Sequence, residues 1–218
     1  MYPIADLVSK LIRCNRDASY PETPISSEID YSTTLILLLV LLTESYLARV
    51  RFFDKTTDPK KKKMAPTYLA SLNGCSRLAK RFSEVYLLRN AIAHNHVFEY
   101  QQQWNSDGHC RYRKFKIGPS WQGESNSAVY SKYVMLPKYA EPKSSLLGLR
   151  VVPGRMGRED VLIVFEVVQQ VLQQLHKKKY LDLSIDWHVP YQPVGQNRAQ
   201  LSFPFWDLIT EIRKVTEK

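Results

Sequence analysis

One segment of the chain, residues 86–96, brings together side chains that could cleave a phosphodiester bond without a metal. It reads Tyr-Leu-Leu-Arg-Asn-Ala-Ile-Ala-His-Asn-His. Histidine, with an ordinary pKa of about 6.5, gains and loses protons near neutral pH. Arginine stays protonated, and its planar guanidinium can hold phosphate oxygens and stabilise the charge that develops on them. The segment therefore predicts RNA cleavage in which Arg89 binds phosphate and His94 transfers protons.

The spacing of Arg89 and His94 carries little information by itself, because a chain with five histidines and many arginines often contains such a pair. Its context is more informative. Asn90 follows the arginine directly, small and apolar residues fill the gap, and Asn95 and His96 come at once after it. Asn90 precedes His94 by one helical turn, so it can orient that histidine or bind phosphate. A surface arginine with two capping or packing histidines is the alternative interpretation.

Helical geometry separates the two histidines. On an ideal helix, a separation of five residues turns about 140°, whereas seven residues return to nearly the same face. His96 is therefore better aligned with Arg89 than His94 is. Either the arginine side chain reaches round the helix, or the helix deforms near the histidines.

The segment resembles the motif of the HEPN superfamily (higher eukaryotes and prokaryotes nucleotide-binding domains). In that family an arginine, often followed by a polar residue, precedes a histidine by four to six intervening residues. Arg89-Asn90-Ala91-Ile92-Ala93-His94 matches the commonest form, and Arg89 to His96 fits the longer one. The expected long helices, with the motif near the end of a central one, are also similar to the family's arrangement.

This resemblance implies a helical bundle that dimerises and joins two motif copies in one cleft. The implied activity is metal-independent cleavage of single-stranded RNA by 2′-hydroxyl attack, often in a toxin or an antiviral defence effector. Some members place an acidic residue on an earlier helix, which points to Glu44 as a residue that binds substrate alongside Asn95. Other relatives only bind nucleotides or proteins, so a non-catalytic module that binds nucleic acid or a protein partner is the alternative.

One subgroup of the family is not expected. Its toxins are silenced by nucleotidyl transfer to a tyrosine two positions after the histidine. Here His96 stands at that position, or Phe98 when the count starts at His96, and Tyr100 is out of register. Whether a neutralising protein or a nucleotidyltransferase partner exists stays open.

The charge balance favours a polyanionic partner. The chain has 31 Lys and Arg against 21 Asp and Glu, a formal net charge of +10. Each phosphate that a cation neutralises releases condensed counterions, which favours binding. RNA, DNA and acidic membrane surfaces are therefore all possible partners. The alternating basic and aromatic segment 109–117 could bind RNA through Arg111, Arg113 and Lys114, or form a solvated hairpin. Lys60 to Lys63 are interpreted as a charged loop rather than a nucleic-acid patch.

Composition argues against cofactors and metals. Neither a G-x-G-x-x-G nor a G-x-x-x-x-G-K sequence occurs. Cys14, Cys75 and Cys110 are far apart and form no C-x-x-C pair, so neither a zinc site nor a disulfide framework is expected. The start of the chain lacks signal-peptide features, and the charge-free window 31–43 falls short of the roughly 18 to 20 apolar residues that span a bilayer. We expect a soluble, cytoplasmic protein with no membrane partner.

Apolar periodicity predicts a single, mainly α domain over residues 1–218. Helices are expected where apolar residues recur every three or four positions, namely 3–17, 30–53, 67–102, 159–179 and 203–216. The run from Leu35 to Leu42 predicts the central buried helix, and Gly74 is expected to kink or divide the third. Residues 103–158 are expected to form an irregular insertion, with a strand over 109–117 that pairs with 129–136.

Overall fold

The computed structural model describes residues 2–16, 18–20, 23–53, 64–93, 98–104, 106, 110–117, 134–135, 142–178, 188–191 and 201–217. Helix accounts for 74% of the residues that can be interpreted, so the prediction of a mainly α chain is confirmed. The α-helices run in the order α1 (Tyr2–Ile12), α2 (Ser26–Phe53), α3 (Ala65–Ser71), α4 (Ser76–Ala93), α6 (Arg158–Lys177) and α7 (Leu208–Thr216).

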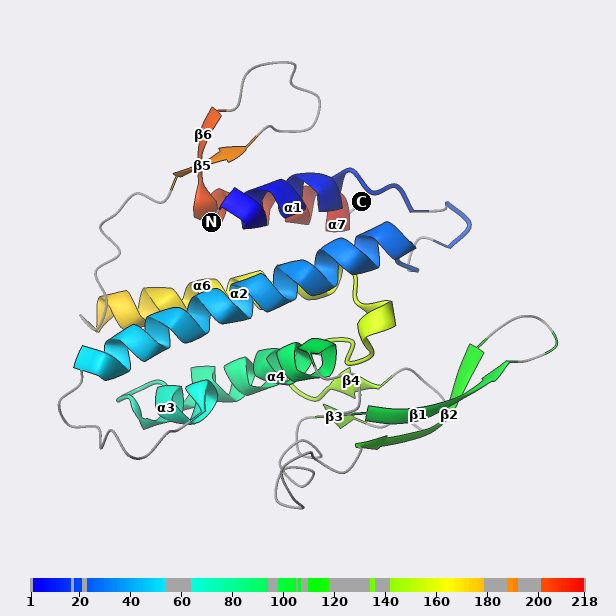
Figure 1. Ribbon diagram of the computed structural model, residues 1–218, viewed down its shortest axis with the longest axis horizontal. Helices are drawn as coiled ribbons and strands as arrows, with labels where there is room; N and C mark the ends of the chain where they lie inside the picture. The colour runs from blue at the N-terminus through cyan, green and yellow to red at the C-terminus, as the bar shows by residue number, and fades with distance from the viewer. Residues whose placement is uncertain are drawn as a thin grey trace.

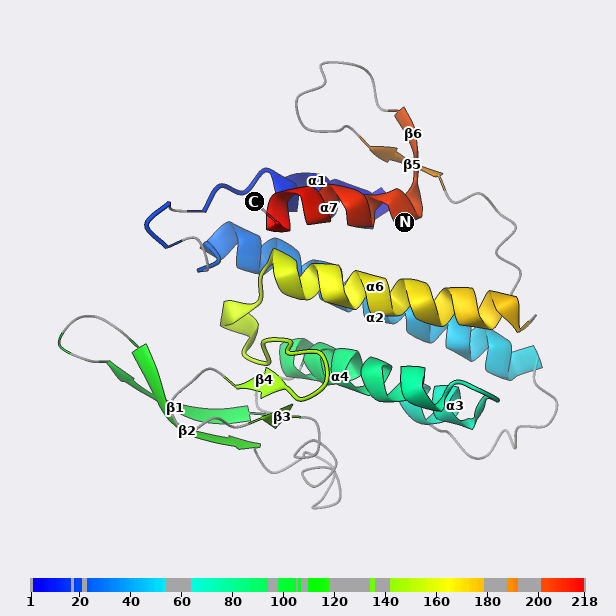
Figure 2. The same ribbon diagram turned by 180° about the vertical axis from the view of Figure 1, so that it is seen from behind.

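Two long helices form the centre of the bundle (Figures 1 and 2). α2 and α6 lie side by side, with α1 and α7 along one side of the pair and α3 and α4 along the other. The predicted central helix is α2, in which Leu35, Ile36, Leu39 and Val40 are completely buried. Each such side chain stabilises the fold by roughly 1.5–3 kcal/mol, because its apolar surface leaves water. α2 therefore serves as the common support for α1, α4 and α6.

Gly74 divides the third predicted helix, as expected. Its backbone φ is +75°, a left-handed conformation that glycine adopts without steric cost. α3 ends before this turn and α4 begins after it. The predicted end at residue 102 is wrong, because α4 stops at Ala93 and strand β1 (Phe98–Trp104) follows. Pairing with the next strand of the chain, β2 (Cys110–Ile117), accompanies the extended conformation of that segment, and helical periodicity does not report such pairing.

The predicted strand over 109–117 is confirmed, but its predicted partner is wrong. β2 (Cys110–Ile117) pairs antiparallel with β1 rather than with 129–136, and the register shifts between Gln101 and Gln102. Within 129–136, the short strand β3 (Val134–Met135) pairs instead with β4 (Lys143–Ser144). A hairpin between neighbouring strands closes a shorter loop and loses less chain entropy. The irregular insertion therefore begins with β1, earlier than predicted.

The last part of the chain returns to the far side of the bundle. A hairpin of β5 (His188–Tyr191) and β6 (Leu201–Pro204) contacts α1. The helix predicted over 203–216 starts later, because β6 and a 3-10 turn (η2, Phe205–Asp207) precede α7. A second 3-10 turn, η1 (Pro153–Arg155), comes before α6. The chain ends beside α1, so both termini lie on the same side (Figure 1).

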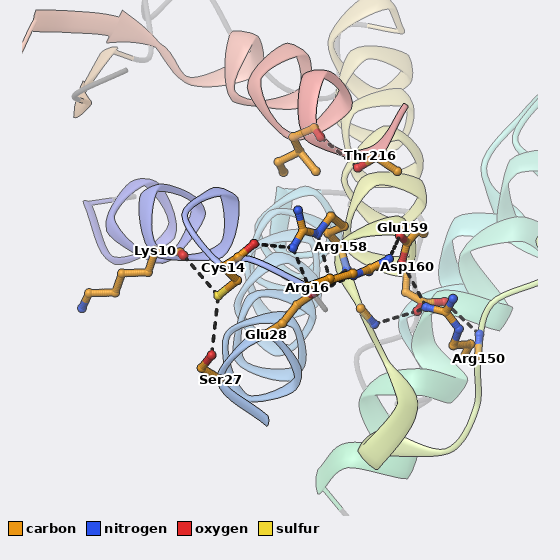
Figure 3. Close-up of polar contacts among 12 residues, drawn as sticks. Lys10, Cys14, Arg16, Ser27, Glu28, Arg150, Arg158, Glu159, Asp160 and Thr216 are labelled. Atoms are coloured by element: carbon orange, nitrogen blue, oxygen red, sulfur yellow. Dashed lines mark hydrogen bonds and ion pairs between the residues drawn. The ribbon is translucent and has the colours of Figure 1, made fainter. Parts of the chain in front are cut away.

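A buried ionic cluster joins the loop after α1 to the first turns of α2 and α6 (Figure 3). Glu28 is completely buried, and its carboxylate accepts hydrogen bonds from the side chains of Arg16 and Arg158. Glu159 also pairs with Arg16, while Asp160 accepts from the backbone N–H of Gly157. The cluster fixes where α2 and α6 begin relative to the loop after α1.

Among the described helices, α2 is long and apolar enough to cross a membrane by length and composition. Its 18-residue window has a mean hydropathy of 1.6. Of that window, 39% is buried inside the bundle. The core helix of a soluble protein has the same composition, so this one helix is weak support for membrane insertion.

Candidate functional site

Arg89 lies in the last turns of α4, on the side of the helix that faces α2. The buried face of α4 includes Phe82, Val85 and Leu88, which anchor the helix in the core. Arg89 follows Leu88 directly and remains at the edge of that core, with 26% of its side chain exposed. The guanidinium is therefore placed by a rigid element and is still accessible to a ligand.

Two neighbours on α4 hold the guanidinium of Arg89. Nη1 donates a hydrogen bond of 2.9 Å to Oδ1 of Asn90, whose side chain is buried. The guanidinium carbon also lies 5.6 Å from the centre of the Tyr86 ring, within the range of a cation–π contact. Of the five N–H groups of an arginine, one is used by Asn90. Glu44 approaches Nε, so three N–H groups of the terminal nitrogens stay available, within the described contacts, to an anion that approaches from solvent.

Glu44 reaches the same guanidinium from α2. Its Oε2 lies 3.9 Å from Nε of Arg89, and 24% of the Glu44 side chain is exposed. The structure thus places Glu44 in a partly exposed ion pair. At this distance and exposure the pair contributes about 1 kcal/mol or less to stability. A phosphate could displace such a partner at little cost.

The two histidines follow the end of α4. His94 is the next residue after Ala93, the last helical position. His94, Asn95 and His96 themselves lie outside the described residues.

Three further candidates lie in β2. Arg111, Arg113 and Lys114 belong to this strand, and the backbone of Arg111 is opposite Gln103 while that of Lys114 is opposite Gln101. The hairpin that carries them follows α4 in the chain, and Figure 1 shows it beyond the same end of the bundle. Positions of their side chains lie outside what the structure describes.

The structure thus brings Arg89, Asn90 and Glu44 together from the predicted set and adds Tyr86. The sequence signal for Tyr86 was its place one turn before the arginine, on a neighbouring part of the helix surface. Within the described part of the chain, no group of three or more His, Cys, Asp or Glu side chains could hold a metal ion. Cys14 and Cys75 are buried free thiols.

Comparisons of the chain with protein-family models, with curated proteins and with solved structures found no match. The interpretation of the site therefore rests on its own residues.

Proposed function

We propose that this chain is a metal-independent endoribonuclease of the HEPN type that cleaves single-stranded RNA as a homodimer. The observation that supports it is the guanidinium of Arg89, held by Asn90 and approached by Glu44, one turn before the helix end that leads into His94. A fixed, partly exposed cation beside titratable side chains suits phosphoryl transfer. The toxin or antiviral role that the resemblance implies is part of this proposal.

The chemistry needs two proton transfers and one stabilised phosphorane. One imidazole removes the proton of the 2′-hydroxyl, and the 2′-oxygen forms a bond to phosphorus. The bond from phosphorus to the 5′-oxygen breaks, and a protonated imidazole donates to that leaving oxygen. The products are a 2′,3′-cyclic phosphate and a 5′-hydroxyl. Arg89 stabilises the charge on the non-bridging oxygens, and two motif copies in a dimer supply both imidazoles.

The remaining residues assist in different ways. Asn90 orients the guanidinium through its hydrogen bond, and Glu44 limits its movement from the α2 side. His96 serves as the second candidate for proton transfer. Asn95, Arg111, Arg113 and Lys114 contact the substrate in this proposal, on the grounds of charge and hydrogen-bonding capacity.

Cleavage of labelled single-stranded RNA in EDTA tests the proposal. Wild-type protein is expected to give 2′,3′-cyclic phosphate ends. Arg89→Ala should lower the cleavage rate by about 10²–10³-fold, as loss of a group that stabilises the transition state does. His94→Ala should do the same, with folding and dimerisation unchanged. Arg13→Ala, an exposed arginine next to α1, is the matched control and should keep full activity.

Two other results would contradict the proposal. Activity that survives Arg89→Ala and His94→Ala together would place the cleaving group elsewhere. If no form cleaves RNA but both substitutions weaken RNA or protein binding, the chain is a non-catalytic binding module.

A further inference from the structure

A second polar feature lies between α4 and α6, on a different side of α4 from the Glu44 contact. There the two helices contact one another and run antiparallel, with α6 drawn above α4 in Figure 2. They border a groove of about 500 Å³, within the range of about 300–1,000 Å³ typical of ligand clefts. Its polar lining consists of three cations and three amides: Arg77, Arg81, Lys177, Gln170, Gln173 and Gln174.

The lining follows helical periodicity on both helices. Arg77 and Arg81 are four residues apart on α4, and Gln170, Gln174 and Lys177 recur at intervals of four and three on α6. Residues at such intervals share one face of a helix. Two polar stripes therefore face one another across the groove. The partly buried Leu78 belongs to the same lining and packs against the core.

The cations of the groove lack acidic partners within the described part of the chain. The lining contains no carboxylate there, and none of the described ion pairs includes Arg77, Arg81 or Lys177. The Arg81 guanidinium donates instead to Oε1 of Gln170 across the groove. A fourth cation lies at one end, since a Cβ at Gly74 would be 3.8 Å from Nζ of Lys178. Uncompensated positive charge in a hollow attracts anions.

We propose that this groove binds the phosphodiester backbone of single-stranded RNA. The identity of the ligand rests on the proposed function, while the site is separate from the Arg89 site. Arg77 and Arg81 are about 6 Å apart along the helix axis, a distance of the order that separates successive phosphates of an extended strand. The glutamine amides can donate to and accept from ribose and base edges, which a purely ionic patch for a membrane surface does not require.

The groove and the Arg89 site share α4. Arg81 precedes Arg89 by eight residues, which corresponds to about 12 Å along the axis and about 80° of rotation. A strand that binds in the groove and follows α4 towards its end therefore reaches the Arg89 site within a few nucleotides. The groove would hold the part of the substrate next to the cleaved bond and raise its local concentration there.

Binding of a fluorescein-labelled 2′-O-methyl RNA tests this site apart from cleavage, because the methylated 2′-oxygen cannot attack phosphorus. Arg77→Gln with Arg81→Gln should weaken binding at least tenfold at low salt. It should also reduce the slope of log K against log salt by about 1.4, at about 0.7 for each phosphate that is no longer neutralised. Lys177→Gln alone, at an exposed helix end, should show half that change in slope.

The matched control removes two cations from the opposite side of the bundle. Lys10→Gln with Arg13→Gln changes the net charge equally, and α1 lies far from α4 in both views of the molecule. This variant should bind as wild type does. Equal losses in both double variants, no loss in the groove variants, or no RNA binding by wild type would each overturn the groove proposal.

Cleavage of ordinary RNA in EDTA separates the two proposals. If wild type cleaves RNA and the groove variants bind unchanged, the groove proposal fails and the nuclease proposal stands. If the groove variants lose binding but no form cleaves RNA, the groove stands as an RNA site and the nuclease proposal fails.

Discussion

Arg158 donates three hydrogen bonds to the carboxylate of Glu28. The Arg158 backbone N–H and side-chain Nε donate to Oε1 at 3.0 and 3.1 Å, and Nη2 donates to Oε2 at 2.9 Å. Arg16 adds Nε, which donates to Oε2 at 2.9 Å (Figure 3). Each guanidinium comes from a different part of the chain, so a single carboxylate ties the loop after α1 and the start of α6 to α2.

Stability should therefore fall at acid pH. Although burial disfavours its charged form, the hydrogen bonds from Arg16 and Arg158 lower the pKa of Glu28 to about 2. A carboxyl with a depressed pKa contributes stability that is present above its ordinary pKa, here 4.5, and lost as pH falls towards 2. The loss amounts to roughly 3 kcal/mol, at about 1.4 kcal/mol for each pKa unit. Urea unfolding between pH 2 and 6 measures it.

The matched variant for this measurement is Glu28→Gln. It should be less stable at neutral pH by about 3–5 kcal/mol, because the buried guanidinium of Arg158 loses its counter-charge and the partly buried Arg16 keeps only Glu159. It should also lose much of the pH dependence below 4.5. Burial raises the pKa of Asp160. Protonation of that carboxyl therefore favours the folded state as pH falls, opposite to the effect of Glu28. An identical acid slope in wild type and Glu28→Gln would contradict the assignment to Glu28.

Gly157 should not tolerate a methyl group. An added Cβ would lie 2.9 Å from Cγ of Pro24, 3.0 Å from Nη2 of Arg16 and 3.0 Å from Oε2 of Glu159. Overpacking of this kind costs about 1–3 kcal/mol. Gly154→Ala is the control, since nothing lies within 4 Å of its Cβ and the loss of backbone freedom in the unfolded chain favours alanine. Thermal unfolding should show a lower Tm for Gly157→Ala only.

Local sequence patterns predicted the helices well and their ends less well. Apolar periodicity located α2 and α6, since each buries one face, and Gly74 marked the break before α4. Periodicity extended the third helix to residue 102, but Phe98–Trp104 form a strand paired with β2, and a helical pattern does not report strand pairing. The family resemblance, not any spacing in this chain, pointed to Glu44 as a substrate-binding residue, and its place near Arg89 follows from the contact between α2 and α4.

The buried polar contacts were missed for a different reason. Glu28 and Arg158 are 130 residues apart, so no local pattern indicates that they meet. Glu84 is similar: it is buried on α4 and accepts hydrogen bonds from the backbone N–H groups of Leu146 and Leu147. In a helical pattern, such a carboxylate is indistinguishable from a solvent-exposed one. The groove cations could have been found, because Arg77 and Arg81 share a helix face by their spacing.

Two buried serines should respond in opposite ways to alanine. The hydroxyl of Ser32 has no hydrogen-bond partner among the residues that the structure describes, so Ser32→Ala removes an unsatisfied polar group and should leave stability unchanged or raise it by up to about 1 kcal/mol. The hydroxyl of Ser144 accepts a hydrogen bond of 3.0 Å from the backbone N–H of Leu149. Ser144→Ala leaves that buried donor unpaired and should cost about 1–3 kcal/mol. Urea unfolding of both variants measures the contrast, and equal losses would contradict it.

The two polar neighbours of Arg89 should differ in their effect on RNA cleavage. Asn90→Ala removes the 2.9 Å hydrogen bond that orients the guanidinium, and misplacement of a catalytic group lowers rates by up to about 100-fold. Glu44→Gln removes only a partly exposed contact at 3.9 Å, so the rate should fall about fivefold or less. Single-turnover cleavage in EDTA measures both effects. The pH optimum should stay the same in both variants, because the histidines transfer the protons. A larger loss in Glu44→Gln than in Asn90→Ala, with a shifted pH profile, would instead make Glu44 a participant in proton transfer.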